Sequence, residues 1–229
     1  MKSLVLCLAV VLTPLLALSQ SYDLVIQGGR VIDPETGLDA VRNVGITQGK
    51  IKKISVDALE GKRVISAKGL IVAPGFIDLH QHAQDIESQR VKALDGVTTA
   101  LEMEIGKPDV AAFLQSQEGH SLINYGTTAS HPAARSLVFG TPLPVDGLLP
   151  KTGAATDKPA SPDQIEKMKA RLRHELDAGA LGIGMGIQYT PGATRWEVIE
   201  MFRLAAEHSV PVYTHVRSNG KLEPGSNIE

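Results

Sequence analysis

The sequence predicts an α/β fold in which a small β-sandwich segment, residues 20–73, precedes an incomplete (β/α) barrel of the TIM type, residues 74–229. Up to Val72 the chain consists of short β-rich runs separated by Gly, Pro and Asp. After Pro74, strand-sized runs alternate with helix-sized segments, which is the order of a parallel sheet covered by helices. With 43% hydrophobic and 21% charged residues, the chain can bury an ordinary globular core.

Residues 1–19 differ from the rest of the chain and predict a signal peptide. Lys2 supplies a positive start, residues 4–16 are almost wholly apolar, and a small-x-small cleavage site ends at Ser19. The alternative is a membrane anchor, but an anchor needs about 20 apolar residues, and Pro14 interrupts this shorter run. We expect export to the periplasm or the medium, with no membrane attachment after cleavage.

The predicted sandwich segment contains five strand-sized runs joined by turn signals. The dipeptides Gly28-Gly29, Asp33-Pro34 and Gln48-Gly49 stand between runs, and dipeptides of this kind favour hairpin turns. We expect strands at Asp23–Gln27, Arg30–Ile32, Val44–Ile46, Lys50–Ser55 and Arg63–Ile65. The segment therefore reads as a small all-β layer that ends near Pro74.

The predicted barrel segment contains five further strand-sized runs. We expect them at Gly75–Leu79, Thr98–Ile105, Ser121–Gly126, Leu181–Met185 and Val210–Tyr213. A closed barrel has eight strands and about 250 residues. We therefore expect the chain to be the first part of a longer protein, truncated after strand five.

Two predicted helices in the barrel segment have strong start signals. The runs beginning at Ser161 and Thr194 both match a capping box. The first helix has apolar residues at helical spacing, namely Ile165, Met168, Leu172 and Leu176. Gly179 is placed to end that helix. Residues 142–160, rich in Gly, Pro, Thr and Ala, predict a long loop that either overhangs a site or serves as a flexible linker.

Charge and cysteine content exclude several functions. A formal net charge of -2 leaves no basic surplus to neutralise phosphates, so we expect a small-molecule substrate and no nucleic acid. Cys7, the single cysteine, lies inside the predicted signal peptide. The mature chain therefore has no disulfide, thiolate ligand or cysteine nucleophile, and metal chemistry falls to His, Asp, Glu and Lys. The oligomeric state stays open.

The strongest local signal is the run P-G-F-I-D-L-H-Q-H from Pro74 to His82. Alternation along an apolar strand puts His80 and His82 on one face, and at the C-terminal mouth of a barrel strand that face points into the site. Two neutral imidazoles can then bind one divalent ion. The alternative is an exposed strand end that holds no metal.

A second signal lies in predicted strand two. Glu102 and Glu104 share one face there, while the other face carries Leu101, Met103 and Ile105. Two carboxylates that point into an apolar barrel need a cation, and a carboxylate can hold or bridge zinc. We predict Glu104, nearer the mouth, as the ligand and Glu102 as the reserve. The alternative is an acid pair bonded to lysines or water.

These motifs resemble the amidohydrolase superfamily, whose first barrel strand ends in P-G-F-I-D-x-H-x-H. The segment Tyr22–Asp33 is similar to that family's opening strands, and the resemblance continues to Asn219. In particular, the chain is similar to the N-acyl-D-amino-acid deacylases. Three stretches resemble that branch: N-x(6)-H-x(3)-R from Asn124, G-A-L-G with Y-x-P-G from Gly179, and T-H-x-R from Thr214.

The resemblance implies a barrel of the metal-dependent hydrolase kind that holds one or two divalent ions, with zinc as the expected metal. It makes His215 the third protein ligand, on strand five; the alternative is a histidine bonded to a neighbouring loop. The chain departs from the branch at strand two, where a simple count puts Ile105 in place of a cysteine ligand. Substrate binding is implied for His131, Arg135, Tyr189 and Arg217. The alternative for His131 is a role in stabilising a loop. The alternative for Arg217 is an ion pair with a surface acid.

The implied activity is hydrolysis of non-peptide carbon–nitrogen bonds, here deacylation of N-acyl-D-amino acids by a metal-bound hydroxide. In the superfamily an aspartate after strand eight moves the proton and a further histidine ligand ends strand six. We expect both beyond residue 229 and therefore expect this stretch alone to be inactive. The alternatives are a cyclic amidohydrolase of the dihydroorotase or hydantoinase kind, a dipeptidase-like member, or an inactive metal-binding fragment.

Overall fold

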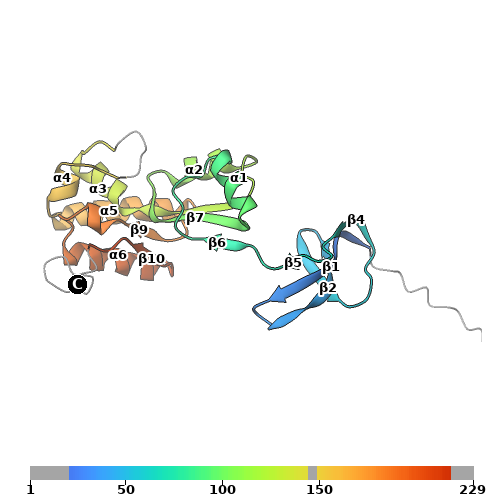
Figure 1. Cartoon of the computed structure of the whole chain (residues 1–229). Coiled ribbons are helices and arrows are strands. Elements are labelled where there is room, and N and C mark those ends of the chain that lie inside the picture. Colours follow the sequence, from blue (N-terminus) through green and yellow to red (C-terminus); the bar gives the residue numbers. More distant parts are fainter. Residues whose placement is uncertain (1–20, 144–148, 218–229) are drawn as a thin grey trace, which may run out of the picture. The chain divides into compact units, whose positions relative to one another are not determined.

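The computed structural model describes residues 21–143 and 149–217 (Figure 1). The predicted signal peptide, residues 1–19, lies outside the described residues, as does part of the predicted loop, residues 144–148. In the described ranges no helix is long and apolar enough to cross a membrane. The chain divides into two compact units between Pro74 and Gly75.

The first unit is a five-stranded sheet. Its strands are β1 (Tyr22–Asp33), β2 (Leu38–Thr47), β3 (Lys50–Ser55), β4 (Gly61–Ser66) and β5 (Ile71–Val72). The strand order is β3-β2-β1-β4, with β5 also paired to β1. The β1–β2 and β2–β3 pairs are antiparallel, whereas β4 and β5 run parallel to β1.

One turn prediction in this unit is wrong. Gly28-Gly29 does not join two strands, because β1 continues through it with a β-bulge between Ile26 and Gly29. Gly28 has a φ of 72°, which glycine adopts without strain, and a Cβ on Gly29 would lie 2.5 Å from Val72 Cγ2. The prediction at Gln48-Gly49 is confirmed: both residues have positive φ, at 51° and 69°, and they join β2 to β3.

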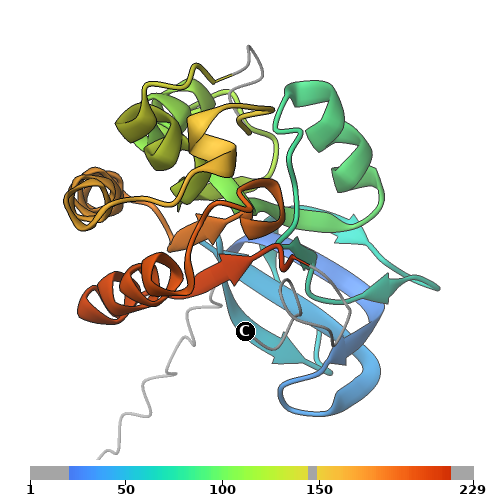
Figure 2. The same ribbon diagram turned by 90° about the vertical axis from the view of Figure 1, so that its left-hand side faces the viewer.

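The second unit is built on a parallel sheet of five strands. They are β6 (Phe76–Asp78), β7 (Val97–Lys107), β8 (Asn124–Ser130), β9 (Ile183–Met185) and β10 (Val212–Thr214), in the order β10-β9-β8-β7-β6. All four neighbouring pairs are parallel. The sheet curls as part of a barrel would, with helices along its outer side (Figure 2). The predicted α/β fold class is confirmed.

Six α-helices and one 3-10 turn are described between and beside these strands. They are α1 (Ile86–Leu94), α2 (Val110–Gln117), α3 (His131–Phe139), α4 (Ala154–Asp157), α5 (Pro162–Asp177), η1 (Ile187–Tyr189) and α6 (Arg195–Glu207). The short α4 lies within the stretch predicted as a loop. The core lies between the sheet and these helices, and its fully buried members include Met168, Leu172, Ile183, Met201 and Leu204.

The two predicted helix starts have different outcomes. At α5 the capping box forms in full, because Ser161 Oγ accepts from Gln164 N and Gln164 Oε1 accepts from Ser161 N. At α6 Thr194 accepts from Glu197 N at 3.1 Å, but the Glu197 carboxylate turns into the interior instead of back to the cap. The second capping box is therefore half formed.

The third barrel strand lies later than predicted. We predicted Ser121–Gly126, whereas β8 spans Asn124–Ser130. Its last five residues, G-T-T-A-S, are all buried, yet they are small or polar and so lack the apolar pattern that marks a core strand. As a result His131 directly follows the strand and begins α3.

Candidate metal centre

His80 and His82 lie just after the first strand of the curled sheet. The strand β6 ends at Asp78, and His80 then forms an isolated bridge with Glu102 of β7. Gln81, between the histidines, donates its backbone N–H to Leu101 O at 3.0 Å and is buried. The two imidazoles therefore project to the same side, with ring centroids 5.0 Å apart.

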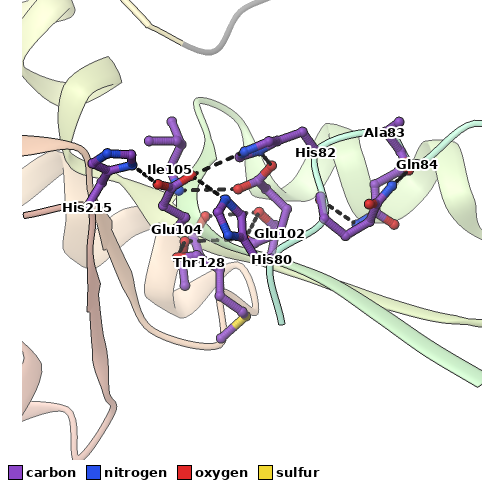
Figure 3. A network of polar contacts seen from close by, with 12 residues as sticks. His80, His82, Ala83, Gln84, Glu102, Glu104, Ile105, Thr128 and His215 are labelled. Carbon is purple, nitrogen blue, oxygen red and sulfur yellow. Dashed lines mark hydrogen bonds and ion pairs between the residues drawn. The ribbon is translucent and has the colours of Figure 1, made fainter. Parts of the chain in front are cut away.

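Glu104 brings the two histidines together. Its Oε2 lies 2.8 Å from His80 Nε2 and 3.1 Å from His82 Nε2. These three residues each offer one ligand atom, and the three atoms lie within 4.8 Å of one another (Figure 3). The Glu104 side chain is 13% exposed, whereas that of His80 is 63% exposed, so solvent reaches this group from the histidine side.

His215 reaches the same carboxylate from the other end of the sheet. Its Nδ1 contacts Glu104 Oε1, the oxygen that does not face His80 and His82. The His215 backbone N–H donates to Met185 O at 2.9 Å, which extends the β9–β10 pairing by one residue. The strands β7 and β10 are not neighbours in the sheet, so its curl is what brings these side chains together (Figures 2 and 3).

Glu102, the predicted reserve ligand, lies one step behind this group. Its side chain has no exposed surface, and its Oε2 contacts His82 Nδ1. Its other oxygen, Oε1, accepts from Ile105 N at 3.2 Å. The structure thus gathers His80, His82 and His215 around the Glu104 carboxylate, and Glu102 lies against the other ring nitrogen of His82.

An irregular stretch of β7 begins after Glu102 and carries Glu104. Pairing with β8 runs normally to Glu102↔Thr127 and resumes only at Lys107↔Ala129. Inside the gap Thr128 Oγ1 donates to Met103 O at 2.9 Å and so satisfies a carbonyl that has left the ladder. Bulges of this kind re-aim side chains near functional sites.

The electrostatic setting of Glu104 follows from its neighbours. Burial alone would raise the pKa of this carboxyl group, but the hydrogen bond from His215 and the nearby His80 outweigh burial, and the pKa lies below its ordinary value of 4.5. Glu104 is therefore held as an anion at neutral pH. An anionic oxygen among imidazole nitrogens is a donor set that fits zinc.

Two of the predicted substrate-binding residues lie beside this group. The Tyr189 hydroxyl is 3.5 Å from His215 Nδ1, and the two rings have centroids 4.9 Å apart. Arg217, two residues after His215, donates from Nη2 to the Ala193 carbonyl. Both residues flank the end of β10, where His215 meets Glu104.

The other two, His131 and Arg135, are not brought to this group. They are fully buried and face Glu197 of α6, which has no exposed surface either. Glu197 Oε1 lies 2.7 Å from His131 Nε2, and Arg135 Nη1 donates to both Glu197 oxygens at 2.6 and 2.5 Å. Both side chains are fully buried in this structure, and their role in substrate binding stays a prediction.

Sequence reasoning missed the role of Glu197, which we treated as part of a capping box. Burial raises the pKa of this carboxyl group, but the hydrogen bond from His131 and the charge of Arg135 outweigh burial, and the pKa is lowered. A signal was present: Arg135 lies in a stretch of small residues, and a buried arginine needs an acidic partner. No local sequence pattern identifies that partner, because it lies 62 residues later in the chain.

Comparisons with known proteins give a consistent family. No family model matches the chain. An N-acyl-D-glutamate deacylase of Alcaligenes xylosoxydans xylosoxydans is 30% identical over 222 residues, covering 89% of this chain and 45% of that protein. A D-aminoacylase of the same organism is 28% identical over 228 residues, covering 89% and 46%. A dihydroorotase of Geobacter metallireducens is 38% identical, but over 38% of this chain and 23% of that protein.

A solved structure agrees with these relatives. An N-acyl-D-glutamate deacylase of Bordetella bronchiseptica, complexed with zinc and a phosphonate inhibitor, superposes with a TM-score of 0.71 at 25% identity, over 88% of this chain and 46% of that one. The chain spans about half the length of the curated relatives it matches. In sequence and in fold the chain is similar to the N-acyl-D-amino-acid deacylases of the amidohydrolase superfamily.

Proposed function

We propose that the protein is a metal-dependent amidohydrolase that removes the acyl group from N-acyl-D-amino acids. The observation that supports this is the shared carboxylate: Glu104 Oε2 faces His80 and His82, while Glu104 Oε1 faces His215. Two imidazoles on one side and one on the other suit one or two divalent ions, zinc in the first place. The likeness to deacylases over 89% of the chain supports the substrate class.

The residues around the carboxylate receive distinct roles. His80, His82, Glu104 and His215 would hold the ion or ions. When bound, a divalent ion would polarise the amide carbonyl and lower the pKa of a water, so that hydroxide attacks the acyl carbon near neutral pH. Tyr189 would orient the substrate beside His215, and Arg217 would pair with the substrate carboxylate.

Metal binding by the 229-residue chain tests this proposal. Zinc bound per chain is measured by equilibrium dialysis for the wild type, His80→Ala and Glu104→Ala, with His120→Ala as control because His120 is exposed and outside the group. We expect both site variants to lose zinc and the control to keep it. Unchanged zinc content in both site variants would reject the site.

A second assay separates deacylation from cyclic-amide hydrolysis. Acetylated D-amino acids are compared with hydantoins and dihydropyrimidines as substrates of the zinc-loaded full-length protein. The shorter stretch of likeness to a dihydroorotase, 38% of the chain against 89% for the deacylases, favours the linear amides. Turnover of the cyclic amides alone would reject the deacylase assignment and support the alternative.

A further inference from the structure

Glu102 is fully buried and contacts His82, yet it stands outside the group of ligand atoms formed by His80, His82 and Glu104. We propose that Glu102 is a positioning residue: it fixes the ring of His82 and the backbone that carries Glu104. The metal-binding part of this inference rests on the proposed function. The contacts themselves are present without a metal, so part of the test is independent of it.

The first contact sets the orientation of the His82 ring. Glu102 Oε2 contacts His82 Nδ1, while His82 Nε2 lies 3.1 Å from Glu104 Oε2. Both ring nitrogens face carboxylate oxygens, and the contact of Nδ1 with Glu102 is the closer of the two, so the single proton of a neutral imidazole stays on Nδ1. The lone pair of Nε2 then points at the ligand group. Histidines that bind metals commonly have such a partner on the other ring nitrogen, which fixes both tautomer and orientation.

The second contact fixes the backbone next to Glu104. Glu102 Oε1 accepts from Ile105 N at 3.2 Å, and Ile105 is 2% exposed. This N–H lies in the stretch where β7 leaves its pairing with β8, so no ladder partner is opposite it. A buried N–H without an acceptor is unfavourable. The contact therefore holds the bulge, and with it the direction of the preceding side chain, Glu104.

The two contacts together require a carboxylate at this position. Both need an acceptor, and a carboxylate has two acceptor oxygens, whereas an amide has one acceptor and one donor. Glu102→Gln keeps nearly the same volume but sets an NH₂ group against either His82 Nδ1 or Ile105 N. Because Glu102 has no exposed surface, solvent does not repair the lost contact.

The tautomer of His82 is the direct readout. The metal-free chain is labelled with ¹⁵N-histidine, and the ring nitrogens of its seven histidines are observed by NMR at pH 8, with His82→Asn used for assignment. We expect His82 Nδ1 to be protonated in the wild type and to lose part of that proton to Nε2 in Glu102→Gln. A wild-type His82 without a proton on Nδ1, or no change in the variant, would overturn the inference.

Zinc binding separates positioning from ligation. We expect Glu102→Gln to bind as many ions as the wild type with about 10–100-fold lower affinity, whereas Glu104→Gln binds fewer. A reduced ion count in Glu102→Gln would make Glu102 a ligand and overturn the inference. If the wild type binds no zinc, the proposed function fails, and the tautomer still decides this inference.

Glu175→Gln is a matched control. Glu175 is 3% exposed, lies on α5 and accepts from Val110 N at 2.7 Å, so it is also a buried carboxylate on a backbone N–H. We expect this variant to keep the wild-type His82 tautomer and zinc affinity. Equal changes in Glu175→Gln and Glu102→Gln would mean that general destabilisation causes the effect, and would also overturn the inference.

Discussion

The buried group formed by His131, Arg135 and Glu197 gives the sharpest prediction for stability. Arg135 is fully enclosed: Nη1 donates to Glu197, Nε donates to Ala155 O at 2.7 Å and Nη2 donates to Lys158 O at 2.6 Å. Glu197→Gln preserves shape but removes the counter-charge of a buried guanidinium. Removing one partner of a buried ion pair in this way lowers the free energy of unfolding by about 3–5 kcal/mol.

The measurement uses a probe next to the mutated residue. Trp196 is the single tryptophan, so its fluorescence during thermal unfolding reports on α6. A loss of 3–5 kcal/mol corresponds to a fall in Tm of about 6–20 °C for a unit of this size. The control is Glu207→Gln on the same helix, because the pair of Glu207 with Arg173 is solvent-exposed and such pairs contribute about 0.2–1 kcal/mol.

Acid titration adds a second readout with a defined sign. The pKa of Glu197 is lower in the folded protein than its ordinary value of 4.5. Its contribution to stability is therefore present above about pH 4.5 and is lost as the pH falls through the folded-state pKa. We expect the wild type to lose stability below pH 4.5 and Glu197→Gln to lose less over the same range.

The reasoning fails if Glu197→Gln loses no more stability than Glu207→Gln. A double variant extends the test, because replacing both charged partners removes the uncompensated charge. Arg135→Met with Glu197→Leu should therefore be less destabilised than the two single variants summed. Strict additivity would show that the pairing of Arg135 with Glu197 is not the source of the effect.

Two further predictions concern single hydrogen bonds. Thr128→Val should cost about 1–3 kcal/mol of unfolding free energy, because it leaves the carbonyl of Met103 in the β7 bulge without its donor. Thr128→Ser should cost less, because it keeps the hydroxyl. The control Thr156→Val should also cost less, because the Thr156 hydroxyl has no partner among the described residues. Equal losses of stability in all three variants would contradict this account. Ser161→Ala should cost about 0.5–2 kcal/mol in urea unfolding by removing the α5 cap, and an unchanged midpoint would refute that role.

Signals that depend on neighbouring residues were readable from the sequence. The Ser161 cap and the Gln48-Gly49 turn are satisfied by atoms a few residues away, so local chemistry decides them. The projection of His80 and His82 to one side follows from the two-residue period of extended chain. The β8 strand was misplaced because its buried residues are small and polar, and burial there depends on what packs against it.

The sequence by itself determined the fold class, the histidine pair and the presence of two carboxylates in strand two. Only the tertiary structure decided which carboxylate meets which histidine, because the curl of the sheet brings Glu104 to His215, 111 residues away. Likewise it decided that His131 and Arg135 face Glu197 inside the protein. Such pairings depend on which strands and helices become neighbours, and that is fixed by packing of the whole unit and not by any local pattern.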